Sequence, residues 1–150
     1  MNKILILALT LTPLLTHISA TAAQDDTIGL TAHNIFDNRT SLGLSAKIKH
    51  RQLVNMRAQM AATQAIIGLL AEEEFEKAAK ISRAKLGVTD EMKQIYSLSK
   101  NEDFKKLGLD FHNSADELAT TLQSKDMKKS LQALRNTIGY CVQCHNIFRQ

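Results

Sequence analysis

The chain has 150 residues, enough for one domain with a buried core. Its formal net charge is +4, but it has no basic stripe with interleaved aromatic residues, which excludes the usual pattern of a nucleic-acid-binding protein. A single proline, little glycine and many Ala, Leu, Lys, Gln and Glu residues favour an all-α fold.

The first 23 residues have the pattern of a secretory signal peptide. Lys3 precedes an apolar run over residues 4–15, and small residues at 20–23 offer a cleavage site. The apolar run is too short to remain as a membrane span. We therefore expect an exported protein with no membrane span after cleavage, in which residues 24–44 form an N-terminal extension and residues 45–150 form one helical domain.

Two helices are predicted before residue 87, separated by a change of phase in the apolar pattern. Helix one is predicted over 45–71, and its seam alternates steps of three and four residues: Leu53, Met56, Met60, Thr63, Ile67 and Leu70. Helix two is predicted over 73–86, and Gly87 is placed to end it. Its core candidates are Phe75, Ala78, Ala79 and Leu86. No turn residue marks the boundary, so the phase change alone predicts the turn.

Residues 88–100 are predicted to be a connection containing a short helix that begins at Thr89. Asn101 is a natural N-cap for helix three, because Glu102 and Asp103 follow it in the first turn. The expected apolar side of helix three consists of Phe104, Leu107, Phe111, Ala115, Leu118 and Leu122.

The fourth helix is predicted to begin after Ser124 or Asp126, either of which can cap it. Its seam again alternates steps of three and four residues: Leu131, Leu134, Ile138, Cys141, His145 and Phe148. This spacing predicts that Cys141 and His145 face the bundle interior together with the leucines. Gly139 either lets a cofactor or a neighbouring helix approach closely or is a tolerated surface residue.

The most specific motif is Cys141-Val142-Gln143-Cys144-His145. This C-x-x-C-H pattern receives haem through two thioether bonds and ligates the iron with the adjacent histidine. Residues three and four apart share one patch of a helix, so the cysteines can anchor the macrocycle edge while the imidazole reaches the iron. We therefore expect one covalently bound haem c, with His145 on its iron.

Other interpretations of the cysteines fit the sequence less well. A thioredoxin-like dithiol would need a preceding strand, whereas the upstream sequence has helical periodicity. A zinc site would need a fourth ligand, and the histidines at positions 17, 33, 50 and 112 show no paired ligand spacing. His50 and His112 fall beside their seams, so we expect exposed or edge residues rather than a pair of axial haem ligands.

A secreted, proline-poor helical bundle with C-x-x-C-H on its last helix resembles the class II c-type cytochromes, which comprise cytochrome c′ and its low-spin relatives. The resemblance covers roughly residues 49–149. It is carried by C-V-Q-C-H-N-I-F-R, ending at Arg149, by His50-Arg51-Gln52 and by Phe75. The tryptophan that often precedes the third helix of the family is missing.

The resemblance implies an antiparallel up-down-up-down four-helix bundle with the haem on the C-terminal helix. It also implies that His145 is the proximal ligand. Arg149 would lie near the haem edge, one helical turn beyond His145, where it could interact with a propionate. The alternative role for Arg149 is a cation that complements the dipole at the helix end.

The group on the second face of the iron decides the function. Methionine gives a six-coordinate, low-spin centre suited to electron transfer, whereas an apolar residue leaves a site for a diatomic gas. If helices one and four are antiparallel neighbours, the rise of ~1.5 Å per residue places Met56 at the height of His145, with Met60 as second choice. Met56 is otherwise a gap-filling core residue. A gap-free alignment on the cytochrome c′ pattern instead places Ala58 there and predicts an open site.

We therefore predict a periplasmic cytochrome that exchanges single electrons with redox partner proteins. We do not expect an enzyme, because no serine, cysteine or carboxylate constellation supports catalysis. The alternative is a five-coordinate haem protein that binds nitric oxide or carbon monoxide, and a third interpretation is a metal-binding or dithiol protein without haem. Pairing of two copies into a homodimer through helix one, as in many family members, is left open by the sequence.

Overall fold

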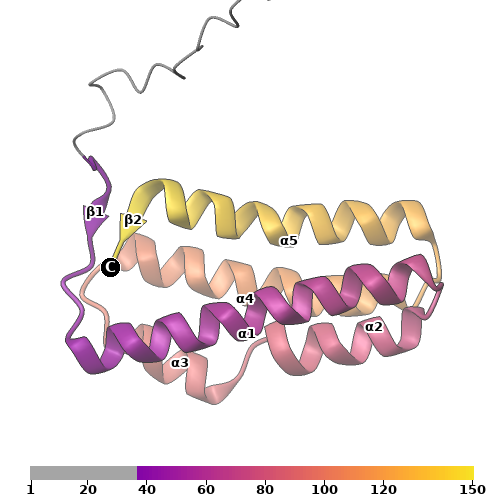
Figure 1. Ribbon diagram of the computed structural model, residues 1–150, viewed down its shortest axis with the longest axis horizontal. Coiled ribbons are helices and arrows are strands. Elements are labelled where there is room, and N and C mark those ends of the chain that lie inside the picture. Colours follow the sequence, from indigo (N-terminus) through magenta and orange to yellow (C-terminus); the bar gives the residue numbers. More distant parts are fainter. Residues whose placement is uncertain (1–36) are drawn as a thin grey trace, which may run out of the picture. The chain divides into compact units, whose positions relative to one another are not determined.

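The structure is a computed structural model that describes residues 37–150 (Figure 1). The predicted signal peptide and most of the predicted extension lie outside the described residues. Residues 38–150 form one compact unit. Its elements are β1 (Thr40–Ser41), α1 (Ala46–Ala71), α2 (Phe75–Ile81), the π-helical turn η2 (Ser82–Leu86), α3 (Asp90–Ser97), α4 (Glu102–Leu122), α5 (Met127–Ile147) and β2 (Phe148–Arg149). Within this part of the chain, no helix is long and apolar enough to cross a membrane.

Four helical segments run up, down, up and down in an antiparallel bundle: α1, α2 with its continuation η2, α4 and α5 (Figure 1). Helix α1 packs chiefly on α2 and η2, whereas α4 packs on α5, α2 and η2. The predicted all-α four-helix fold is confirmed. The short helix predicted in the connection is α3, which packs on α4.

The helices begin where the sequence places capping side chains. The N-cap side chains each accept a hydrogen bond from a backbone N–H three residues on: Ser45 from Ile48, Thr89 from Met92, Asn101 from Phe104 and Asp126 from Lys129. These bonds satisfy donors that the first helical turn leaves without an intrahelical partner. The unmarked break between α1 and α2 is also confirmed, since Glu73 takes a left-handed backbone conformation with φ of 57°.

The core lies between α1, α2, η2, α4 and α5. The core residues predicted for helix two are confirmed, and Leu86 is fully buried at the end of η2. On α4, the predicted residues are buried except Leu107, which is half-buried. The largest fully buried apolar side chains are Ile66, Leu70, Leu86, Leu118 and Leu122.

The predicted seam of helix one is wrong in part. Leu53, Met60 and Ile67 are 39 %, 69 % and 51 % exposed. The buried residues of α1 are instead Gln52, Ala62, Ile66 and Leu70. Leu70 is buried as predicted, but before it the inward stripe lies one residue earlier than predicted, at Gln52, Ala62 and Ile66. A polar and a small residue thus occupy part of this stripe. Apolar periodicity could not locate this stripe because the larger apolar side chains flank it on the solvent side.

The predicted seam of helix four is also shifted. Leu131 is 50 % exposed, whereas Ser130, Leu134 and Thr137 are buried. The Thr137 hydroxyl donates to the carbonyl of Ser114 on α4 at 3.2 Å, so the two helices meet through small hydroxyl residues. A pattern that counts only apolar residues misses such a contact, because a buried hydroxyl is tolerated wherever it finds a partner.

The chain on either side of the bundle closes into a two-stranded parallel sheet. Thr40 of β1 lies opposite Phe148 of β2, and Ser41 lies opposite Arg149. The N–H of Leu42 then donates to the carbonyl of Arg149 at 3.0 Å. The last residues of the predicted extension therefore belong to the compact unit and hold the segment that follows α5.

Candidate functional site

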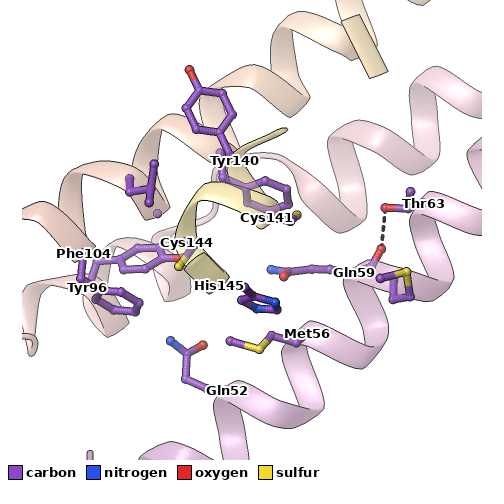
Figure 2. A pocket seen from close by; sticks show the side chains of 14 residues that line it. Gln52, Met56, Gln59, Thr63, Tyr96, Phe104, Tyr140, Cys141, Cys144 and His145 are labelled. Atoms are coloured by element: carbon purple, nitrogen blue, oxygen red, sulfur yellow. Dashed lines mark hydrogen bonds between the residues drawn. The ribbon is translucent and has the colours of Figure 1, made fainter. Parts of the chain in front are cut away.

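A pocket lies between α1, α3, α4 and α5 (Figure 2). Most of its lining is apolar or aromatic, with a few amides and hydroxyls, as is typical of a cofactor site. It is lined by Gln52, Met56, Gln59, Met60 and Thr63 of α1, Tyr96 of α3, Phe104, Leu107, Gly108 and Phe111 of α4, and Tyr140, Cys141, Cys144 and His145 of α5.

The three reactive residues of the C-x-x-C-H motif all line this pocket. Cys141 and Cys144 are half-buried free thiols one helical turn apart on α5. Figure 2 shows the His145 ring pointing from α5 toward α1. Cys141 and His145 both face the pocket, as their spacing predicts, although His145 is exposed at the edge of the pocket and Cys144 faces it as well.

The electrostatic setting of the thiols argues against a reactive dithiol. Burial raises the pKa of Cys141, and burial together with the neighbouring Cys141 raises the pKa of Cys144. Disulfide oxidoreductases instead lower the pKa of the attacking thiol so that a thiolate is present at neutral pH. Among residues 37–150, no group of three or more His, Cys, Asp and Glu side chains is placed to hold a metal ion.

The candidates for the second face of the iron differ in position. Met56 and Met60 both line the pocket, but Met60 is 69 % exposed whereas Met56 is half-buried. The sulfur of Met56 accepts a hydrogen bond from Nε2 of Gln150 at 3.7 Å. Ala58 is exposed and is not among the residues that line the pocket. The geometry therefore favours Met56 among the three candidates.

A buried aromatic group, which periodicity did not reveal as part of the site, forms one wall of the pocket. The Tyr96 ring meets the edge of Phe104 with centroids 5.5 Å apart, and Phe104 meets Phe148 of β2 at 5.6 Å. Burial, with smaller contributions from Cys144 and Cys141, raises the pKa of Tyr96 to about 12. A Cβ on Gly108 would lie 2.2 Å from the Tyr96 ring, so only glycine lets this ring lie against α4.

His112 is buried behind this wall, so the prediction of an exposed or edge residue is wrong. His112 is 1 % exposed. Its Nδ1 lies 2.6 Å from the carbonyl oxygen of Leu86, so an Nδ1–H group can donate a hydrogen bond to this carbonyl. Its Nε2 lies 3.4 Å from the Tyr96 hydroxyl. Burial lowers the pKa of His112. His112 and the exposed His50 are both outside the set of pocket-lining residues.

Arg149 does not lie one helical turn beyond His145, because α5 ends at Ile147 and Arg149 is in β2. Its Nε donates to the carbonyl of Arg39 at 3.2 Å. Nη1 of Arg39 in turn donates to the carbonyl of His145 at 3.2 Å. Arg39 thus satisfies a carbonyl at the end of the helix, the role considered for Arg149. A place for Arg149 beside the haem stays a prediction.

The surroundings of Gly139 show whether a neighbouring helix requires glycine at this position. A Cβ added at Gly139 would meet no heavy atom within 4 Å. Close approach of another described helix therefore does not require glycine at this position.

The family comparison agrees with the site. A family profile described as Cytochrome C' matches residues 43–149. The chain belongs to the cytochrome c′ family. The matched range contains every residue that lines the pocket, and membership of the cytochrome c′ family implies haem binding by this helical bundle. Neither the curated proteins nor the solved structures include a match to the chain.

The residues present fit a haem. Two thiols at the spacing of thioether attachment, an imidazole and a half-buried thioether line one largely apolar pocket between helices. The C-x-x-C-H motif could be recognised from the sequence because its residues are close together along the chain. The sequence did not place Tyr96 or Gly108 in the pocket, or Gln150 beside Met56, because these contacts arise only through packing between distant segments.

Proposed function

We propose that this protein carries one haem c, attached covalently through Cys141 and Cys144, and transfers single electrons in the periplasm. The observation that supports the proposal most directly is that both thiols, the His145 imidazole and the Met56 thioether line the same pocket. When bound, the haem supplies reversible one-electron chemistry at its iron.

The residues of the chain would each have a distinct task. The two thiols would anchor the macrocycle to α5, and the imidazole of His145 would provide the proximal nitrogen. Arg39 holds the carbonyl of His145 and thereby fixes the end of α5. The aromatic wall around Tyr96 and Phe104 excludes water, which limits the rearrangement that accompanies electron transfer.

Met56 is proposed as the distal ligand. Met56 is a half-buried residue of α1 that lines the pocket, and a thioether is a soft donor that stabilises ferrous iron. A ligand already in the pocket needs little movement when the oxidation state changes. This favours electron transfer over gas binding as the function.

Electron exchange with periplasmic redox proteins, rather than an enzymatic reaction, is the proposed role. The exposed position of His145 leaves one side of the pocket close to the surface, where a partner can approach. Pairing of two copies is also proposed, because α1 exposes four large apolar side chains: Leu53, Val54, Met60 and Ile67.

Absorption spectroscopy and mass spectrometry test the proposal on protein made in a host that matures c-type cytochromes. We expect the mass of one covalently bound haem and a low-spin spectrum with a methionine-to-iron charge-transfer band. Met56→Ala should abolish this band, whereas the matched control Met60→Ala should retain it. Two unmodified thiols would disprove covalent attachment. High-spin bands with ready carbon monoxide binding in the unmodified protein would favour the gas-binding function instead.

A further inference from the structure

We propose that Gln150 is a positioning residue for Met56, and that the hydrogen bond from its side-chain amide to the Met56 sulfur raises the reduction potential of the centre. The inference rests on the proposed function, because it takes Met56 as the distal ligand. It concerns a residue that lies 94 positions from Met56 in the sequence and outside the C-x-x-C-H motif.

The contact joins two half-buried side chains. Nε2 of Gln150 lies 3.7 Å from Sδ of Met56, a distance suited to an N–H donor and the large sulfur atom. A thioether sulfur has lone pairs and no hydrogen to donate, so only the nitrogen end of the amide can make a favourable contact with it. The chemistry of the sulfur therefore fixes the orientation of the amide.

The other polar atom of the Gln150 amide supports a specific role for this orientation. Oε1 of Gln150 is buried and has no hydrogen-bond partner. Leaving a buried acceptor unpaired is unfavourable, so such an atom in a folded protein calls for a physical reason. The bond from Nε2 to the sulfur of Met56 supplies a reason for holding the amide in this place.

The backbone of Gln150 is also held against α1. Nζ of Lys49 donates to the carbonyl of Gln150 at 3.3 Å. Lys49 and Met56 are seven residues apart on α1, two helical turns, and therefore lie on one side of that helix. The preceding residue, Arg149, is fixed by pairing with Ser41 and by the bond from Leu42. Gln150 thus reaches Met56 from an anchored backbone.

The expected electronic effect follows from the lone pairs of sulfur. One lone pair can accept the amide hydrogen while the other remains available to the iron. The hydrogen bond withdraws electron density from the sulfur, which makes it a weaker donor to ferric iron and favours the ferrous state. Loss of the amide should therefore lower the reduction potential.

The test compares Gln150→Leu and the near-isosteric Gln150→Met with the unmodified haem-loaded protein. Gln64→Leu is the matched control, because Gln64 is exposed on the same helix as Met56. Spectroelectrochemical titration measures the potential, and the absorption spectrum reports the methionine-to-iron band. We expect both Gln150 variants to shift the equilibrium toward ferric iron by about threefold to tenfold, the effect of one net hydrogen bond, whereas Gln64→Leu leaves it unchanged.

The outcomes separate this inference from the proposed function. Loss of the methionine-to-iron band in the Gln150 variants alone would also support a positioning role, since the thioether would then depend on the amide for its place. An intact band with a potential equal to that of Gln64→Leu, or a higher potential, would overturn the inference and leave Met56 ligation standing. Absence of the band in the unmodified protein would overturn both.

Discussion

The imidazole of His112 is a buried, neutral group with a partner at each nitrogen. Its position beside the apolar stripe of α4 suggested exposure, but Leu86 and Gly87, at and after the end of η2, cover it. The covering residues belong to a separate segment of the chain, so the burial of His112 was not predictable from the periodicity of α4 alone.

This burial predicts a pH dependence of folding stability. Desolvation lowers the pKa of His112 below its usual ~6.5, against smaller opposing effects of the Leu86 and Gly87 carbonyls and of Asp116. The unfolded chain therefore binds a proton at higher pH than the folded chain does. The stabilisation is complete above pH ~6.5 and is lost as the pH falls toward the depressed pKa of the folded state.

Urea unfolding across this pH range measures the effect. We expect the free energy of unfolding to fall with decreasing pH below ~6.5 in the unmodified protein and less steeply in His112→Asn. His50→Asn is the control, because His50 is exposed and this variant should keep the slope of the unmodified protein. An unchanged slope in His112→Asn would contradict the prediction.

Helices α3 and α4 depend on a close contact at Gly108. A Cβ there would lie 2.2 Å from Cε1 of Tyr96, so Gly108→Ala must displace the ring or the helix. We expect a net destabilisation of about 1–3 kcal/mol from overpacking, measured by urea unfolding. Gly68→Ala is the matched control: its Cβ would meet nothing within 4 Å, so it should stabilise α1 by ~0.5–1 kcal/mol. Equal stability of the two variants would disprove the proposed contact.

The helix ends were predictable because capping is local. Asn101 and Asp126 each bind an N–H three residues away, and no distant segment is needed to recognise them. The inward faces of α1 and α5 were harder to predict. Gln52 and Thr137 are buried, and their burial depends on the pocket and on the partner helix rather than on their own helical period.

The same distinction applies to the site. Cys141, Cys144 and His145 lie within one helical turn, so their spacing identified them before any fold was known. Tyr96 lines the pocket only through its packing on α4, and Gln150 contacts Met56 only because the end of the chain lies against α1. Residues of this second kind need the tertiary structure.

At the scale of the whole compact unit, the pocket lies between α1 and α5. Helix α1 packs chiefly on α2 and η2, whereas α5 packs chiefly on α4. A bound haem would complete the packing between α1 and α5. We therefore expect the protein with covalent haem to be more stable than the same chain made in a host that cannot attach it, by ~3 kcal/mol or more, the effect of burying a few large apolar groups.

Thermal unfolding followed by circular dichroism measures this difference. The haem-free chain should have a lower Tm, and hydrogen exchange should show the largest loss of protection in the part of α1 that faces the pocket. Equal melting temperatures would show that the helices complete their packing without the cofactor.

The parallel pairing of Thr40 and Ser41 with Phe148 and Arg149 involves only two residues on each side, yet it closes a loop of more than a hundred residues. So few bonds can open by local fraying at a free-energy cost far below that of melting the bundle. Such an opening would break the hydrogen bond from Arg39 to the carbonyl of His145 and the hydrogen bond from Gln150 to the sulfur of Met56, while every helix stayed folded. A conformational fluctuation at this small sheet would thus be transmitted to both faces of the iron at once.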